Sequence, residues 1–469
     1  MNPLLLPTED YDQVFERITN IALEYLCALK DLPSFPAVTG AETQATFAAD
    51  LREQGIGMAA LDDLSKVIAG LRPGTPRFFG YVHGSGEPVA AAADLLASVL
   101  NQNVTSWRSG PSAATIERTV VGWLAEMIGC KGLTGSLCGG GSSANLMGLA
   151  IGREASLAAN ETGIAKPGAI YASTEVHMSI GKAVALLGIG RDNLRLIPCD
   201  DEFRIRTDLL RETIAKDVTA GVRPIAIVGS AGTVNTGAVD PLSELHAIAR
   251  EHKAWFHIDG AYGALAAIAK PGLFRGIELA DSLSLDPHKW LYQPIDCSCV
   301  LYRDTARARQ TFSHSGDYTK SYFEDPIESF LFFDETMELS RRFRALKLWL
   351  SLRYHGLAAF REAIRNDLEL AAYFAGRVDA ESELERLAPA PLSVVCFRYV
   401  PKSGVSPDSL DELNRQILPK VIRRGRVFLS NATIHGRFAL RICVVNHRST
   451  RADIDEVVSE VLSVGRELS

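Results

Sequence analysis

Apolar positions follow two different spacings along the middle of the chain. Short, nearly continuous apolar runs are separated by longer stretches in which apolar residues recur every three or four positions. The short runs predict buried strands and the longer stretches predict helices. The predicted strands are 170–172, 194–197, 225–228, 255–258, 282–285 and 299–302, and the clearest predicted helices are 90–100, 116–128 and 242–252. Apolar strands that alternate with helices are typical of an α/β fold, with a mostly parallel sheet covered on both faces.

The first part of the chain is predicted to be helical. Apolar residues recur at helical spacing over 11–30 and over 61–71, and Pro33 and Pro73 follow these stretches. Two such helices have too little core to be stable alone. We therefore expect residues 1–75 to form a helical arm that packs on another surface and helps to form a dimer.

The last part of the chain mixes helices and strands. The pattern predicts a long helix at 340–354, strands at 392–399 and 438–445, and helices at 410–423 and 452–464. This α+β pattern differs from the strand-helix alternation before it. We expect a large domain over 76–339 and a smaller C-terminal domain over 340–469.

Charge and cysteine usage narrow the class of protein. The formal net charge is −7 and no basic run is present, which argues against nucleic acid or an anionic membrane as a partner. No apolar run reaches the ~18–20 residues of a membrane helix, and the N-terminus does not resemble a secretory signal. The eight cysteines are scattered without a Cys-x-x-Cys pair. We expect free thiols, no metal site and a reducing, cytoplasmic setting.

One lysine stands where ligands gather in α/β sheets, at the carboxyl end of a strand. Lys289 lies in the segment Asp286-Pro287-His288-Lys289-Trp290, directly after the strand predicted at 282–285. A lysine amine that is partly neutral attacks aldehydes. The alternative is an ordinary surface lysine in the first turn of a helix.

A carboxylate ends another predicted strand. Asp259 follows the apolar run 255–258 and precedes the small residues 260–263, which would let a flat group lie close to the backbone. A carboxylate in this place could keep a pyridine nitrogen protonated and so make the ring an electron sink. Asp259 could equally cap the N-terminus of a helix.

Two further segments could complete a cofactor site. Three glycines, 139–141, and the segment Ser142-Ser143-Ala144-Asn145 precede an apolar helix predicted at 146–153, an arrangement that can cradle a phosphate. A plain tight turn is the alternative. His177 follows the strand at 170–172 and could stack on a ring, act as an acid, or have a structural role.

Taken together, these four features satisfy a phosphorylated pyridine aldehyde group by group. The sequence resembles the group II pyridoxal 5′-phosphate (PLP)-dependent amino-acid decarboxylases over almost its whole length. The matching segments are Pro76–Phe79, Ser142–Asn145, Gly232-Thr233, His257–Tyr262, Ala280–Ser282, Pro287–Trp290 and Arg341–Trp349. The resemblance implies the aspartate-aminotransferase fold (fold type I), homodimers with shared active sites, and decarboxylation of an L-amino acid to an amine and CO₂.

The resemblance also implies roles for individual residues. Lys289 would form the internal aldimine, Asp259 would pair with the pyridinium nitrogen, and His177 would stack on the ring opposite Ala261. Tyr318, on a loop, would return a proton after CO₂ leaves. The further cofactor contacts that it implies are Gly141, Ser142, Thr233 and His288.

The sequence departs from the aromatic-amino-acid enzymes around the substrate. The polar residues Asn103 and Thr105 stand before Trp107 where those enzymes have apolar residues, with Arg108 next to it. The segment at Tyr81 and His83 is also less apolar, and Asp286 replaces an asparagine beside the phosphate, where a carboxylate would be repelled unless it is protonated or points away. An aromatic L-amino acid remains the first expectation. The alternatives are an acidic or diamino substrate, an aldehyde-forming oxidative reaction, and a PLP lyase that cleaves another bond.

Overall fold

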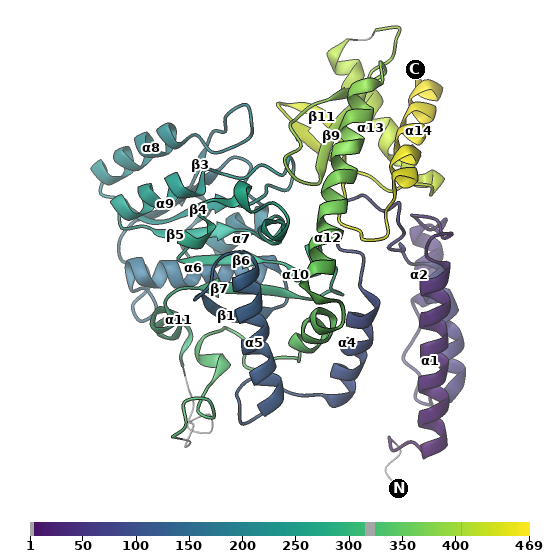
Figure 1. Cartoon of the computed structure of the whole chain (residues 1–469), viewed down its shortest axis with the longest axis horizontal. Helices are drawn as coiled ribbons and strands as arrows, with labels where there is room; N and C mark the ends of the chain where they lie inside the picture. Colours follow the sequence, from purple (N-terminus) through teal and green to yellow (C-terminus); the bar gives the residue numbers. More distant parts are fainter. Residues whose placement is uncertain (1–3, 315–323, 405) are drawn as a thin grey trace.

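The computed structural model describes residues 4–314, 324–404 and 406–469, and its largest element is a seven-stranded sheet (Figure 1). The strand order is β1-β7-β6-β5-β4-β2-β3, in which β7 is antiparallel to both neighbours and the remaining pairs are parallel. The strands are β1 Thr134–Cys138, β2 Gly168–Ser173, β3 Leu194–Ile197, β4 Arg223–Ser230, β5 Trp255–Asp259, β6 Ser282–Leu285 and β7 Ser298–Tyr302. The expected α/β fold is confirmed. The edge strand β1 was not predicted because a glycine and a serine interrupt its apolar residues.

Both faces of this sheet are buried, which explains why its strands are apolar throughout. Alternate residues of each strand enter one of two cores, which are completed by helices on opposite faces. Helices α5, α8 and α9 contribute to one core and α6, α7 and α11 to the other. Their bounds are α5 Pro111–Met127, α6 Gly141–Leu157, α7 Met178–Leu186, α8 Thr207–Thr219, α9 Leu242–Glu251 and α11 Thr305–Phe312. The short helices are α10 Pro287–Trp290, η2 Arg191–Asn193, η3 Ala264–Ile268, η4 Pro271–Phe274, η5 Ile277–Leu279 and η7 Phe332–Asp334.

Two glycines let helix α6 approach strand β5 closely. A Cβ atom on Gly148 would lie 2.6 Å from the ring of His257, and one on Gly152 would lie 2.8 Å from the ring of Trp255. Any larger side chain at either position would push the helix off the sheet. This close packing brings the first turn of α6 to the carboxyl end of β5.

A second, four-stranded antiparallel sheet forms the C-terminal part, with the order β10-β11-β9-β8 (Figure 1). Its elements are β8 Leu384–Arg386, β9 Val394–Tyr399, α13 Pro407–Arg424, β10 Ser430–Ile434, β11 Arg437–Cys443 and α14 Arg451–Leu468. Helix α12, Ala345–Ala380, precedes these elements. It packs against helices that cover the seven-stranded sheet and against a helix that covers the four-stranded sheet.

The predicted start of α12 at residue 340 was wrong by one turn and a half. The chain before Ala345 is irregular because its arginines bind carboxylates on other elements: Arg341 pairs with Glu117 on α5, and Arg344 binds Asp296 at 3.1 Å. The predicted helices at 410–423 and 452–464 are confirmed as α13 and α14.

The N-terminal segment lies along one edge of the molecule, as Figure 1 shows in purple. It contains α1 Thr8–Ala28, α2 Gly40–Phe47, η1 Gly57–Asp63 and α3 Leu64–Ala69, followed by α4 Pro88–Leu100. No residue of α1 is buried, and Tyr11, Phe15 and Leu23 expose 42–55% of their surface. The rest of this chain therefore leaves several apolar side chains of α1 exposed.

The described residues contain no helix that is both long and apolar enough to span a membrane. All eight cysteines are free thiols. Six of them are buried: Cys130, after α5, and five in the sheets or beside them, Cys138, Cys297, Cys299, Cys396 and Cys443.

Candidate active site

Asp259 is held by hydrogen bonds at the carboxyl end of β5. Its Oδ1 accepts bonds from the Ala261 N–H and the Ser284 hydroxyl, both at 3.2 Å, and its Oδ2 accepts one from Asn145 Nδ2 at 3.0 Å. The residue is 7% exposed. It does not cap a helix, because η3 begins only at Ala264, after Gly263. The Oδ2 atom keeps capacity for a further donor, such as a pyridinium N–H.

Asn145 links Asp259 to two histidines, and sequence reasoning missed this role. Its Nδ2 also donates to Ser179 Oγ at 2.9 Å, and its Oδ1 accepts a bond from His257 Nε2 at 2.9 Å. Burial lowers the pKa of His257 to about 4, so the ring is neutral. The available signal was the position of Asn145, one helical turn after Gly141 and so on the same face of α6.

His177 caps the N-terminus of α7 with its ring. The Ser179 N–H donates to His177 Nδ1 at 3.2 Å, and Ser179 Oγ lies 2.8 Å from the same nitrogen. Burial is the main cause that lowers the pKa of His177, against an opposing effect of Asp259. A neutral ring that accepts at Nδ1 carries its proton on Nε2. Through Ser179 and Asn145, His177 belongs to the same hydrogen-bond network as Asp259.

Lys289 lies on α10, and its amine faces a carboxylate. Lys289 Nζ is 2.7 Å from Asp286 Oδ2, and the other oxygen of Asp286 accepts a hydrogen bond from Ser298 Oγ at 2.5 Å. Asp286 is 2% exposed, whereas the Lys289 side chain is 18% exposed. The carboxylate of Asp286 therefore points toward the lysine.

The glycine turn leads directly into α6, which begins at Gly141 and not at residue 146 as predicted. A Cβ atom on Gly141 would lie 2.9 Å from Asp286 Oδ2 and 3.0 Å from Ala261 Cβ. A side chain at this position would press on the carboxylate of Asp286. Ser142 is exposed on the same first turn. A helix N-terminus with glycine at its start leaves backbone N–H groups open to a phosphate.

A loop from the start of the large domain crosses α10. A Cβ atom on Gly84 would lie 2.3 Å from the carbonyl oxygen of His288, so this loop touches the backbone next to Lys289. His83 lies in the loop, and burial, with smaller effects of Arg72 and His288, lowers its pKa to about 4. The Tyr81 carbonyl accepts a bond from Arg441 at 3.0 Å. The imidazole of His288 donates from Nδ1 to the Cys297 carbonyl at 2.7 Å.

Thr233, expected near the cofactor, uses its hydroxyl within its own loop. Thr233 Oγ1 lies 2.9 Å from Thr236 Oγ1 and accepts a bond from the Ala238 N–H at 3.1 Å. Its loop follows β4 and therefore lies at the same edge of the sheet as Asp259.

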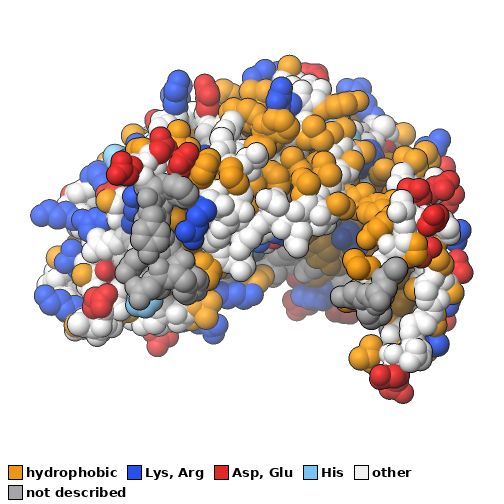
Figure 2. All heavy atoms as spheres, turned by 90° about the horizontal axis from the view of Figure 1, so that it is seen from below, with side chains coloured by type: hydrophobic (Ala, Val, Ile, Leu, Met, Phe, Trp, Pro, Cys, Tyr) orange, Lys and Arg blue, Asp and Glu red, His pale blue; other side chains and the backbone are white. Residues whose placement is uncertain are grey.

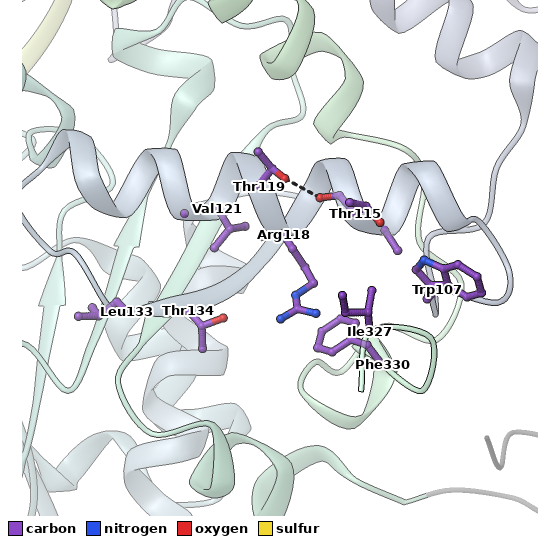
Figure 3. Close-up of a pocket in the computed structure, with 11 residues that line it drawn as sticks. Trp107, Thr115, Arg118, Thr119, Val121, Leu133, Thr134, Ile327 and Phe330 are labelled. Atoms are coloured by element: carbon purple, nitrogen blue, oxygen red, sulfur yellow. Dashed lines mark hydrogen bonds between the residues drawn. The ribbon is translucent and has the colours of Figure 1, made fainter. Parts of the chain in front are cut away.

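The expected substrate residues 103–107 make described polar contacts with Arg341. Asn103 Oδ1 accepts a bond from the Arg341 N–H at 2.9 Å, so its polarity is already used within the chain. Thr105 Oγ1 is buried and has no hydrogen-bond partner among the described residues. Trp107 borders a pocket of about 390 Å³ beside Arg118 and Phe330 (Figure 3). No described hydrogen bond or ion pair joins this segment to Lys289, Asp259 or His177. Tyr318 lies outside the described residues.

The described residues contain no cluster of three or more histidine, cysteine or acidic side chains that could hold a metal ion.

The residues at this edge of the sheet fit a phosphorylated pyridine aldehyde. Asp259 has an oxygen that can accept from a ring nitrogen, the Gly141 turn has backbone donors and no room for a side chain, and Lys289 supplies an amine. A fold of this type with these groups at the strand ends defines a PLP-dependent enzyme of fold type I.

Known proteins identify the family. Residues 53–400 match the pyridoxal-dependent decarboxylase conserved domain. An aromatic-L-amino-acid decarboxylase of Bacillus atrophaeus is 36% identical over 398 residues, which cover 84% of this chain and 82% of that protein. The chain belongs to the pyridoxal-dependent decarboxylase family and is a PLP-dependent amino-acid decarboxylase.

Two solved structures have nearly the same fold over the whole chain. Oryza sativa TDC, solved with PLP and tryptamine, is 27% identical to this chain and superposes with a TM-score of 0.93. The match covers 100% of this chain and 99% of the Oryza chain. A 4-hydroxyphenylacetaldehyde synthase of Rhodiola rosea is 28% identical, has a TM-score of 0.89 and covers 99% of each chain. The expected resemblance to group II decarboxylases is thereby confirmed.

Proposed function

We propose that the chain converts an aromatic L-amino acid to its amine and CO₂. The observation that carries the proposal is the fixed carboxylate of Asp259, which shares the end of the sheet with the amine of Lys289. A carboxylate locked against a pyridine nitrogen supports chemistry that leaves electrons on carbon, as decarboxylation does. The aromatic substrate is supported by the 36% identity with the Bacillus enzyme.

Each residue of the site has a distinct task in this proposal. Bound PLP supplies an electron-accepting ring. Lys289 would hold its aldehyde carbon, and Asp259 would accept a hydrogen bond from the ring nitrogen. His177 and Ala261 would pack on the ring and exclude water. The phosphate contacts are Gly141, Ser142 and His288, with Thr233 supporting the adjoining loop.

Segment 103–107 is proposed to complete the site of a second copy of the chain. The support is the family resemblance, which implies that Asn103, Thr105 and Trp107 line the substrate pocket of an active site shared by two copies. A polar pocket wall favours a substrate ring that carries a hydroxyl group, because an unpaired buried polar group costs roughly 1–3 kcal/mol.

The substrate is tested with a panel of amino acids scored for CO₂ and amine. We expect tyrosine, 5-hydroxytryptophan or tryptophan to exceed glutamate and diaminobutyrate in kcat/KM. Hydroxylated rings should exceed phenylalanine by about tenfold or more, which corresponds to the cost of one unpaired polar group. Glutamate as the best substrate would contradict the aromatic assignment. Phenylalanine as the best would contradict the role of Thr105 alone.

Tyr318 is proposed to return a proton to the carbon that has lost CO₂. The support is its place six residues after Phe312 in a segment rich in serine, glycine and aspartate. A neutral His177 with its proton on Nε2 is the second candidate donor. The similarity to the Rhodiola aldehyde synthase supports an oxidative, aldehyde-forming reaction as the alternative.

The matched test is Tyr318→Phe against Tyr322→Phe, a change of the same kind four residues away. Loss of the phenol should lower amine formation strongly and raise aldehyde, ammonia and peroxide, because the carbanion then lives long enough to meet oxygen. Tyr322→Phe should behave like wild type. If amine formation is unaltered in Tyr318→Phe, His177 becomes the proposed donor.

The assembly is proposed to be a homodimer. Exposed apolar side chains cover helix α4, and apolar side chains also gather on the molecule's face shown in Figure 2. The α4 residues are Leu95, Leu96, Val99 and Leu100, each exposed by 44–57%. A contiguous apolar surface of this kind marks a protein interface.

We propose that each protomer consists of three units: the arm, residues 1–75, the large domain, 76–339, and the small domain, 340–469.

The cytoplasm is the proposed location, supported by eight cysteines without a disulfide. Fractionation of the native cell with detection of the enzyme checks it, and recovery from a membrane or secreted fraction would contradict it.

A further inference from the structure

The carboxylate beside Lys289 is built into the site from several sides. Asp286 is 2% exposed, and its Oδ2 lies 2.7 Å from Lys289 Nζ and 3.6 Å from His288 Nε2. Its Oδ1 accepts the Ser298 hydroxyl hydrogen bond at 2.5 Å. Because the Asp286 oxygens would lie within 3.1 Å of a Cβ on Gly141, the carboxylate also sits against the first turn of α6. A helix N-terminus stabilises a negative charge at this place.

This geometry pairs the Lys289 amine with a carboxylate that can accept a proton from it. An ammonium group has no lone pair, so Lys289 has to lose a proton before it attacks an aldehyde carbon. Among the described residues, Asp286 is the carboxylate that forms an ion pair with Lys289 Nζ. Ser298 and the start of α6 fix the carboxylate from the opposite side, so that it stays within reach of the amine while the lysine side chain moves.

We propose that Asp286 is the acid-base group for the reaction of Lys289 with the cofactor aldehyde. Asp286 takes one proton from the ammonium, and the amine lone pair forms the C–N bond. The carbonyl oxygen leaves as water after it takes one proton from the nitrogen and one back from Asp286. The products are the protonated C=N linkage, water and the original carboxylate, so atoms and charge balance. The same transfer is needed whenever a substrate amine displaces Lys289.

This inference rests on the proposed role of Lys289, and the experiment separates the two. Apoenzyme is mixed with PLP, reduced with borohydride at timed intervals and digested, and the adduct is located and quantified by mass spectrometry. Affinity for 4′-deoxypyridoxine 5′-phosphate, which has no aldehyde, is measured separately and reports binding without the covalent step. An adduct on a lysine other than Lys289 would overturn both the proposed role of Lys289 and this inference.

Asp286→Asn should slow adduct formation on Lys289 by about 100-fold, the usual contribution of one acid-base group. Its affinity for the deoxy analogue should be unchanged or tighter, because a negative charge near the phosphate is removed. Asp286→Ala should be accelerated by added formate, which can occupy the vacated space and accept the proton. A purely structural role of Asp286 would not produce this rescue.

Asp296→Asn is the matched control. Asp296 is a nearby carboxylate that faces Gly139 and binds Arg342 and Arg344, with no described ion pair to Lys289. This variant should form the adduct at the wild-type rate. Adduct formation by Asp286→Asn within about twofold of wild type, or no effect of formate on Asp286→Ala, would overturn the proposal.

Discussion

At the scale of single residues, the site depends on side chains that are neutral or fixed by their neighbours. Asn145 donates to Asp259 and to Ser179 and accepts from His257, so one amide sets the orientation of a carboxylate and joins it to two imidazole groups. A buried carboxylate is stable only when such donors surround it. These bonds leave Oδ2 of Asp259 as the atom that can accept a further hydrogen bond.

Asp259→Asn tests that arrangement. The amide cannot hold a proton on the ring nitrogen, so kcat should fall by about 100-fold or more, the scale of one lost electrostatic partner in an active site. The linkage to Lys289 should still form when PLP is saturating. Borohydride trapping and kcat are measured on the same preparations. Lys289→Ala, which should show neither trapping nor turnover, is the comparison. Full turnover of Asp259→Asn would remove the proposed role of this carboxylate.

At the scale of elements, helix α12 carries a buried acid into the junction between the two sheets. Asp367 is fully buried on α12, and Tyr292, just after α10, donates a hydrogen bond to its Oδ2 at 2.8 Å. Burial is the largest cause that raises the pKa of Asp367 to about 7. An acid whose pKa is raised on folding favours the folded state while protonated. The attachment of α10 to α12 is therefore coupled to pH.

Asp367→Asn should remove this dependence. In wild type, the stabilisation by the proton on Asp367 is fully present below its unfolded pKa near 4 and is lost as the pH rises through about 7, at up to about 1.4 kcal/mol per pH unit. The free energy of unfolding is measured from pH 5 to pH 8 in both proteins. The difference between them isolates Asp367, because the buried histidines are the same in both. Parallel curves for the two proteins would contradict this account.

At the scale of the whole molecule, much apolar surface of α1 and α4 is left uncovered by one chain. Tyr11, Phe15 and Leu23 on α1 are exposed, as are four apolar residues of α4. A second copy would cover this surface, as the proposed dimer requires.

Coexpression of two inactive variants tests whether the sites are shared. We propose, from the family resemblance, that the loop with Tyr318 reaches the active site of the neighbouring chain. Lys289→Ala and Tyr318→Phe each disable one contribution, and in a mixed dimer one of the two sites then receives an intact Lys289 from one chain and an intact Tyr318 from the other. Random pairing should then restore about one quarter of the wild-type amine-forming activity. Light scattering checks the dimer itself. A fully active monomer, or no restoration in the mixed dimers, would contradict the shared site.

The sequence by itself determined strands β2 to β7, the candidate residues and their order along the chain. Buried strands are apolar on both faces, so β2 to β7 could be recognised from local pattern, and Lys289 and Asp259 stand out because each follows such a strand directly. The start of α12 was misplaced because its preceding arginines are fixed by carboxylates far away in the sequence. Local pattern does not contain such contacts.

Only the tertiary structure decided how these residues work together. Asn145, Ser179 and Ser298 are ordinary polar residues in the sequence, and they become part of the site because α6, α7 and β7 begin at the same edge of the sheet. The direction of Asp286 was equally open, since a carboxylate three residues before a lysine can face solvent or the amine. Burial decides it: inside the protein, two opposite charges are stable only when they are paired.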